Sequence, residues 1–158
     1  MERFEPARNQ DLGFGSKLIA AGDFNQDGFP DVVVTLDQGG GERHNSAFLF
    51  LGNGDGTFQA PSRFLGGIYN AGQLAVADLN GDGNEDLVIA NATANSLAVL
   101  LGDGQGNFQP AITFATGNDP GSIAIGDFNN DGKPDLATAN RQTDVGADSI
   151  SVLINDTP

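Results

Sequence analysis

The segment Asp23-Phe-Asn-Gln-Asp-Gly-Phe-Pro-Asp31 occurs three times in this chain with small variations, and it decides how the remaining sequence is interpreted. Its counterparts are Asp78-Leu-Asn-Gly-Asp-Gly-Asn-Glu-Asp86 and Asp127-Phe-Asn-Asn-Asp-Gly-Lys-Pro-Asp135, so that all three share the pattern D-[FL]-N-x-D-G-x-x-D. The second copy begins 55 residues after the first, and the third begins 49 residues after the second. A period of about 50 residues indicates a repeat architecture.

Short apolar runs surround each copy and predict strands. One run precedes the motif, a second follows it, a third lies further on, and a weaker fourth comes after a Gly-rich turn. The runs are Leu18–Ala21, Val32–Val34, Ala47–Leu51 and Pro61–Leu65 in the first repeat, Leu74–Ala77, Leu87–Ala90, Leu97–Leu101 and Ala111–Ala115 in the second, and Ile123–Ile125, Leu136–Ala139 and Ile150–Ile154 in the third. About four strands at this period are typical of a propeller blade.

The chain resembles tandem FG-GAP/VCBS repeats, the blades of integrin α-chain-type β-propellers, over essentially its whole length. The motifs that carry the resemblance are the three Asp-rich loops and the Gly-x-Gly-x-Gly-x-Phe turns that end at Phe58 and Phe108. It implies an all-β fold of three four-stranded blades at about 4–57, 58–107 and 108–156, each with a calcium-binding hairpin loop. It also implies recognition or adhesion outside the cell or on its surface. A single-chain propeller has four to eight blades, so three is a departure.

The Asp-rich loops also predict cation sites on their own chemistry. Ca²⁺ takes about six to eight oxygen ligands, and side chains at loop positions 1, 3, 5 and 9 with a backbone carbonyl at position 7 can surround one ion. The predicted ligands are Asp23, Asn25, Asp27, Phe29 (carbonyl) and Asp31; Asp78, Asn80, Asp82, Asn84 (carbonyl) and Asp86; and Asp127, Asn129, Asp131, Lys133 (carbonyl) and Asp135. An all-oxygen set favours Ca²⁺ over transition metals, and Mg²⁺ resists dehydration into a protein cage. We expect about three calcium ions per chain.

The loops have two other possible interpretations, an EF-hand and a simple turn. An EF-hand requires a bidentate acid at position 12, where this chain has Val34, Ile89 and Thr138, so the ninth-position Asp closes the loop and the ion clamps a β-hairpin. Asp, Asn and Gly are also good turn formers, so one loop could be a turn alone. Three loops that each place three carboxylates close together cost free energy unless a cation neutralises them. The expected role of the ion is structural.

Composition excludes several classes of protein. The chain has 7 Lys and Arg against 21 Asp and Glu, a formal net charge of −14, which disfavours nucleic acids and anionic membrane surfaces as partners. It contains no Cys, so disulfides, a thiolate nucleophile and a Cys-type zinc site are excluded. No apolar run approaches the length of a membrane span, and we expect no membrane insertion.

No catalytic motif stands out. His44 is the only His and lies in a polar Gly-rich stretch, and there is no Gly-x-Ser-x-Gly motif. Gly126–Lys133 superficially resembles a phosphate loop, but its spacing differs and it is the third Asp-rich loop. A pair of carboxylates for glycoside hydrolysis is possible, although nothing singles one out. We expect a protein that is not an enzyme.

Partners are predicted from two features. The connections 35–46, 91–96 and 140–149 vary between repeats, and insertions at one point of a repeat map to one face, which is often the binding face. Idle surface loops are the alternative. Three blades also leave unpaired faces and edges, which predict a homo-oligomer through blade–blade or terminal contacts, either a closed six-bladed ring of two copies or a filament. A fragment of a longer propeller remains the alternative.

These features are compatible with three functions. The first is a non-catalytic, calcium-stabilised recognition or adhesion module that binds protein or glycan. The second is a structural protein that assembles into a ring or an extracellular filament, and the third is an accessory propeller domain of a secreted enzyme. The expected location is extracellular or at the cell surface, because calcium sites of extracellular modules have dissociation constants of about 10⁻⁴–10⁻³ M and fill only where Ca²⁺ is abundant.

Overall fold

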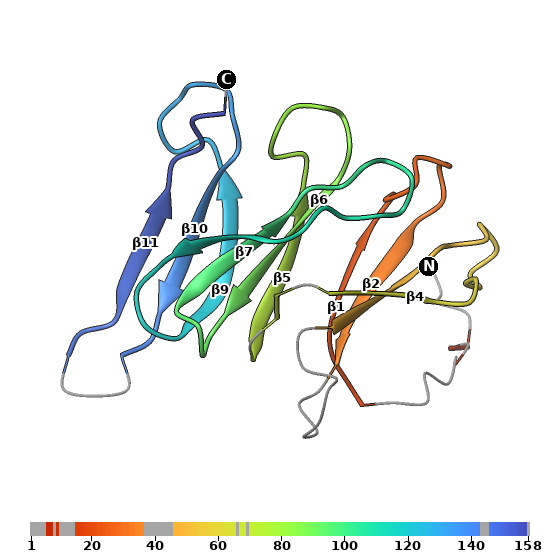
Figure 1. The fold of residues 1–158 in the computed structure, drawn as a ribbon, viewed down its shortest axis with the longest axis horizontal. Coiled ribbons are helices and arrows are strands. Elements are labelled where there is room, and N and C mark those ends of the chain that lie inside the picture. The colour runs from red at the N-terminus through yellow and green to blue at the C-terminus, as the bar shows by residue number, and fades with distance from the viewer. Residues whose placement is uncertain are drawn as a thin grey trace, which may run out of the picture.

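In a computed structural model, the structure describes residues 6, 7, 9, 15–36, 46–65, 67, 68, 70–142 and 146–157. These residues form eleven β-strands and no helix, arranged as three antiparallel sheets that follow one another along the chain (Figure 1). The first sheet contains β1 (Ser16–Gly22), β2 (Asp31–Leu36), β3 (Ser46–Phe50) and β4 (Ser62–Leu65). The second contains β5 (Ala71–Ala77), β6 (Asp86–Asn91), β7 (Ser96–Leu100) and β8 (Ile112–Ala115), and the third contains β9 (Pro120–Gly126), β10 (Asp135–Asn140) and β11 (Ser149–Leu153).

Each sheet is a meander in which consecutive strands pair in the same register. The last residue of the first strand faces the ninth-position Asp of the loop, as in Gly22↔Asp31, Ala77↔Asp86 and Gly126↔Asp135. The repeated motif therefore closes the hairpin between the first two strands of each sheet. The expected all-β fold is confirmed, and the three sheets are consistent with propeller blades.

The sheets differ from the expected repeats in one respect. Within the described residues the third sheet has three strands, in the order β11-β10-β9, rather than the expected four. In the first two sheets the fourth strand follows a Gly-rich turn, and no such turn follows β11 before residue 157. In these two sheets β4 pairs with β3 and β8 pairs with β7, so the run that follows each Gly-rich turn is the fourth strand of the same sheet.

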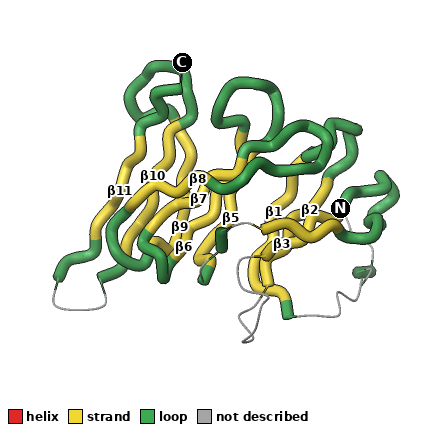
Figure 2. Tube along the Cα trace, in the orientation of Figure 1, coloured by secondary structure: helices red, strands yellow, loops and turns green. Residues whose placement is uncertain are grey.

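The strands of the three sheets are joined by loops at both ends (Figure 2), and the hydrophobic core lies in two layers between neighbouring sheets. Because strand side chains alternate between faces, β6 and β7 place one set of residues toward the first sheet and the other set toward the third. The set in the first layer is Leu87, Ile89, Ala98 and Leu100. The set in the second layer is Val88, Ala90, Leu97 and Val99. The middle sheet is thus buried on both faces, and β5 lies in contact with both β1 and β9.

The first core layer predicts a position-specific loss of stability. Leu87 is fully buried between the first two sheets, so Leu87→Ala should lower the free energy of unfolding by about 2–5 kcal/mol. Ile112→Ala, at an exposed position of β8, should change it by less than about 0.5 kcal/mol. Urea unfolding followed by circular dichroism measures both, since the chain has no Trp. Equal losses at the two positions would contradict the layered core.

Candidate metal centre

The three Asp-rich loops lie at the same end of the three sheets, because each connects the first strand of its sheet to the second. In Figure 1 this end is at the top, where the loops after β1, β5 and β9 turn. All fifteen predicted ligand positions belong to the described residues. The loops have nearly the same internal hydrogen bonds, so one description serves for all of them.

The first Asp of each loop organises the loop backbone around its carboxylate. Asp23 accepts hydrogen bonds from the backbone N–H of Asp27 at 3.1 Å and of Gly28 at 2.9 Å. Asp78 and Asp127 accept the corresponding bonds in the other loops. Gly28 at position 6 has a φ of +84°, a conformation that side chains disfavour, and its two counterparts have φ of +85° and +87°. Glycine at this position allows the chain to turn toward the carboxylate.

The side chains at positions 3 and 5 contact each other. In the first loop Asn25 Nδ2 donates to Asp27 Oδ2 at 2.8 Å, while Asp27 Oδ1 accepts from the backbone N–H of Phe29 at 2.8 Å. The same pairs occur in the second and third loops at 2.8–2.9 Å. Positions 1, 3 and 5 are therefore held close together on an exposed loop.

The ninth-position Asp has a role that the sequence analysis did not include. Asp86 is fully buried, and its two carboxylate oxygens accept from the backbone N–H groups of Leu79 at 2.8 Å and of Gly102 at 2.9 Å. Asp31 and Asp135 are buried and bonded in the same way, with Gly52 and Asn155 in the place of Gly102. This carboxylate thus joins the loop to the chain that leaves the third strand. In the sequence, this role is indicated by the Gly-rich turn that follows the third strand of the first two repeats at a regular position.

Close packing explains why a glycine opens that turn. A Cβ at Gly102 would lie 2.3 Å from the backbone oxygen of Glu85, and one at Gly52 would lie 2.2 Å from that of Pro30. Both distances are far shorter than any ordinary contact, so a side chain at either position would push the turn away from the buried carboxylate. The Gly-rich turn and the Asp-rich loop therefore form one structural unit.

Burial and neighbouring charge act together on the ninth-position carboxylates. Burial raises the pKa of Asp31, the hydrogen bonds from Gly52 and Phe24 oppose it, and the charges of Asp27 and Asp23 raise it further. The pKa of Asp86 is raised by the same causes. By contrast, the N–H of Asn84 and the amide of Asn80 lower the pKa of the exposed Asp82. The second loop thus holds a carboxylate that resists ionisation, Asp86, beside one that favours it, Asp82, and a bound cation would relieve that conflict.

The donor set fits a hard divalent cation better than any other group. Among the described residues, no three acidic, His or Cys side chains are already positioned to hold a metal ion. The loop carboxylates bond instead to N–H groups of their own loop, although each oxygen can accept more than one bond. Three carboxylates, an amide oxygen and a backbone carbonyl per loop are the ligand types that Ca²⁺ takes.

The loops also belong to the contacts between sheets. Gln26 Nε2, in the first loop, donates to the carbonyl of Gly83 at 2.9 Å and to Asn84 Oδ1 at 2.8 Å in the second. Glu85 Oε2 accepts from the N–H of Asp23 at 2.5 Å. An ion in one loop would therefore act on the packing of the neighbouring sheet as well as on its own hairpin.

The apolar residue that follows the first Asp of each loop is buried in the first two loops and exposed in the third. Phe24 is buried, with its ring in edge contact with Phe108 of the next sheet at a centroid distance of 5.3 Å. Leu79 is also buried, but Phe128 is exposed. His44 and Arg43, in the first variable connection, lie outside the described residues.

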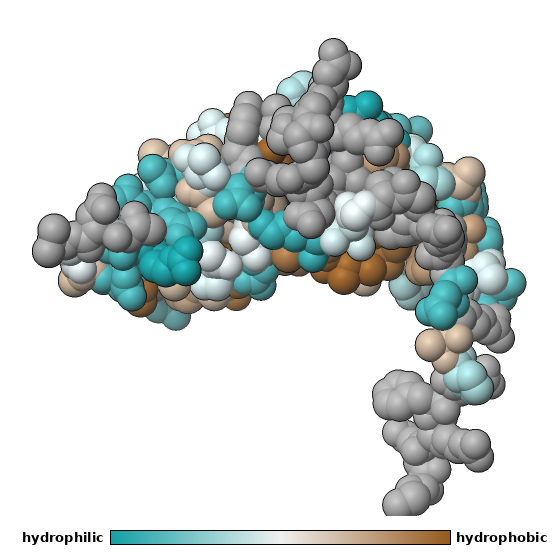
Figure 3. All heavy atoms as spheres, turned by 90° about the horizontal axis from the view of Figure 1, so that it is seen from below, coloured by the Kyte–Doolittle hydropathy of each residue, from teal (hydrophilic) through white to brown (hydrophobic). Residues whose placement is uncertain are grey.

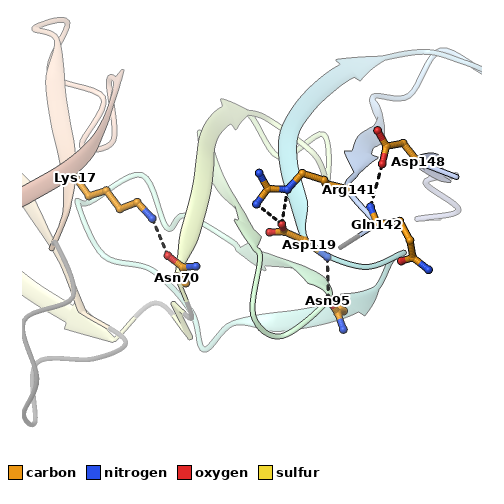
Figure 4. A network of polar contacts seen from close by, with 7 residues as sticks. All are labelled: Lys17, Asn70, Asn95, Asp119, Arg141, Gln142 and Asp148. Carbon is orange, nitrogen blue, oxygen red and sulfur yellow. Dashed lines mark hydrogen bonds and ion pairs between the residues drawn. The ribbon is translucent and has the colours of Figure 1, made fainter. Parts of the chain in front are cut away.

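The opposite end of the sheets carries a polar network (Figure 4). Arg141 donates to Asp119 Oδ2 at 2.6 and 2.8 Å, and Asn95 Oδ1 accepts from the N–H of Asp119 at 2.9 Å. Lys17 Nζ donates to Asn70 Oδ1 at 2.8 Å, which joins the first two sheets. An open cavity of about 880 Å³ is lined by Lys17, Asn70, Asp119, Asn140, Arg141 and Asp148. Figure 3 views this end and shows a hydrophobic patch beside hydrophilic residues.

The family model of the FG-GAP-like repeat matches residues 23–89 and 78–138, which is more than half of the chain. The chain therefore belongs to the FG-GAP-like repeat family.

Similar proteins include integrin alpha chains. Integrin alpha-IIb of Mus musculus is 29% identical over 92 residues, covering 54% of this chain, and integrin alpha pat-2 of Caenorhabditis briggsae is 30% identical over 118 residues, covering 69%. Integrin alpha-5 of Xenopus laevis is 31% identical over 98 residues, covering 56%. The matched part is 9% of the length of each of these relatives. Among the described residues there is no helix of the length and apolar character needed to cross a membrane.

The two roles of the loop carboxylates can be separated by mutation. Asp86→Ala leaves the buried N–H groups of Leu79 and Gly102 without an acceptor, so it should lower the free energy of unfolding by about 2–4 kcal/mol in calcium-free buffer. Asp82→Asn, in the same loop but exposed, should change it by less than about 0.5 kcal/mol under those conditions. Chemical unfolding in the presence of a chelator measures both. A small effect of Asp86→Ala would mean that the carboxylate does not hold the turn.

Proposed function

We propose that the chain is a non-catalytic, calcium-stabilised β-propeller module that recognises a protein or a glycan. The observation that carries the proposal is the threefold repetition of one oxygen-rich loop, with nearly the same hydrogen bonds, at one end of three packed sheets. Membership of a repeat family that also matches integrin alpha chains supports a role in recognition or adhesion.

Calcium would act as a structural ion in each of the three loops. Its ligands would be the residues at positions 1, 3, 5 and 9 and the carbonyl at position 7, as the sequence predicts. Bound Ca²⁺ supplies positive charge where three carboxylates of like charge meet. Since neighbouring loops contact each other through Gln26 and Asn84, this neutralisation would stabilise the packing of the sheets as well as the hairpins. Weak sites of this kind would fill at extracellular calcium concentrations, which supports a location outside the cell or at its surface.

The ligand would bind at the end opposite the calcium loops. The open cavity there combines two cations, two carboxylates and amides contributed by all three sheets, which suits hydrogen bonding to a polar surface of a protein or to sugar hydroxyl groups. Keeping the ion sites and the ligand cavity at opposite ends would allow calcium to hold the sheets in place without contacting the ligand.

Self-assembly into a ring or a filament is the second candidate function. It is supported by apolar side chains that are exposed on the outer faces of the first and third sheets, namely Ile19, Ile150 and Val152. Copies of the chain would complete the propeller by placing these faces against one another. The two surfaces would share one residue, because Ile150 lines the cavity as well as lying on the outer face of the third sheet, whereas Ile19 and Val152 are not among the residues that line the cavity.

Removal of calcium should lower the melting temperature. Ca²⁺ at about 100 times its dissociation constant stabilises one site by about 2.7 kcal/mol, and 1 kcal/mol corresponds to about 2–4 °C for a chain of this size. We expect EDTA to lower the melting temperature by at least about 5 °C, and added Ca²⁺ but not Mg²⁺ to restore it. Circular dichroism melts with elemental analysis of the samples measure the effect.

A matched set of variants tests whether the loops are the sites. The triple change Asp27→Asn, Asp82→Asn and Asp131→Asn should remove the response to Ca²⁺. Asp148→Asn, at the other end of the sheets, should retain it. An unchanged melt after verified metal removal would contradict a structural role for calcium.

Recognition can be tested with glycan and protein arrays probed in calcium-containing buffer, with EDTA as the control. Arg141→Ala, which changes an exposed side chain at the cavity, should weaken binding of the selected ligand by about 10-fold or more while leaving the melting temperature unchanged. Lys133→Ala, at a half-buried position of the third loop, removes a cation far from the cavity and is the matched control, because the predicted calcium ligand at this position is the backbone carbonyl. Equal binding by both variants would place the ligand elsewhere, and the absence of any ligand would favour the structural function.

A further inference from the structure

The repeated register makes individual positions of the three sheets directly comparable. Leu87 pairs with Leu100 in the second sheet, and Leu136 pairs with Leu153 in the third. Leu97 of β7 and Ile150 of β11 therefore occupy the same place in their sheets. Leu97 is 0% exposed because it packs against the third sheet, whereas Ile150 is 74% exposed. The same comparison holds one pleat further along, where Val99 is buried and Val152 is exposed.

The loops show the same contrast. Phe24 is 2% exposed because its ring packs on Phe108 and its carbonyl accepts from the N–H of Gly106 in the turn of the next sheet, at 2.9 Å. Phe128, at the equivalent place in the third loop, is 48% exposed. The following face of the third sheet, formed by Ile150, Val152 and Phe128, thus has the chemistry of a sheet–sheet contact but no covering sheet within the described residues.

A complementary surface lies at the other end of the array. Ile19 of β1 corresponds to Leu74 of β5 and to Ile123 of β9, since all three lie opposite the fourth residue of the second strand. Leu74 and Ile123 pack against the preceding sheet and are 7% and 9% exposed, whereas Ile19 is 67% exposed. Val34 and Phe50 on the same face are already buried, so its exposed part is centred on Ile19.

We propose that the following face of the third sheet binds the preceding face of the first sheet, the face that carries Ile19, in a second copy of this chain. The contact would have the same geometry as the contacts between consecutive sheets within the chain. This inference rests on the proposed association of copies and specifies which face meets which. Ile150 and Val152 would cover Ile19 of the second copy. Phe58 and Gly56 of the first Gly-rich turn are equivalent in sequence to Phe108 and Gly106 of the second. The ring of Phe128 would therefore pack on Phe58 of the second copy, and the backbone carbonyl of Phe128 would accept from the N–H of Gly56.

The second copy is the occupant that the molecule itself indicates. Sheet-to-sheet packing occurs twice within the chain through these same repeat positions, and the exposed faces at the two ends are the two halves of such a contact. The contact is heterologous, since the two copies contribute different surfaces, so it generates either a closed ring or an open series.

Two charge substitutions test the contact from its two sides. Ile150→Glu blocks the third-sheet face, and Ile19→Glu blocks the first-sheet face. Each alone should weaken self-association by about 100-fold or more, because a carboxylate would be buried without a partner. Ile112→Glu, which changes a comparably exposed side chain on β8 outside both faces, should associate like the unmodified chain. Sedimentation velocity over a concentration series in calcium-containing buffer measures the assemblies.

Mixing the two blocked variants tests the polarity of the contact. Ile19→Glu retains a working third-sheet face and Ile150→Glu retains a working first-sheet face, so the mixture should form a one-to-one pair that cannot extend further. A contact between two identical faces would survive one of the single substitutions and would give no such pair. Tagging one variant with a fusion of different mass identifies the mixed pair.

The result that overturns the inference is a chain that remains monomeric throughout the concentration series, or assemblies that both substitutions leave intact. Circular dichroism melts of all variants verify folding, which exposed positions should preserve. The calcium dependence of the melting temperature and the array binding are measured on the same samples. If they persist in a monomeric chain, the recognition function holds and only the contact between copies fails.

Discussion

The buried carboxylates of Asp31, Asp86 and Asp135 hold one end of each sheet in place. Each accepts backbone N–H groups from two parts of the chain that are distant in sequence, the start of its own loop and the segment after the third strand. A buried anion is costly without such bonds, so the loop and the turn must come together for the sheet to form. The same bonds hold the carboxylate in the loop that carries the two other Asp residues, the set for which we propose a cation.

Packing between sheets depends on this arrangement. The loop that the buried carboxylate fixes also carries Phe24 or Leu79 into the contact with the next sheet. The middle sheet is then buried on both faces, as its uninterrupted apolar strands require. The conformation of one loop therefore affects the packing of the neighbouring sheet. Through this link, the calcium ions that we propose in the loops would stabilise the hydrophobic core.

The acidity of the chain is concentrated where it has a structural use. Of the 21 acidic residues, nine are the Asp residues at positions 1, 5 and 9 of the three loops. These carboxylates accept many backbone N–H bonds, and the raised pKa of Asp31 and of Asp86 reflects burial together with the charge of loop neighbours. The cavity at the other end has both signs of charge, so the two ends of the sheets offer different chemistry to ions and to ligands.

The sequence by itself determined the number of repeats, the all-β class, the hairpin position of each loop and the oxygen-rich chemistry of its side chains. These properties are local, because strand alternation, turn residues and ligand spacing are read from neighbouring positions. Only the tertiary structure decided that Asp86 bonds to Gly102 and that Ile150 is exposed where Leu97 is buried. These depend on contacts between segments far apart in the chain, and identical motifs acquire different environments according to whether another sheet lies beside them.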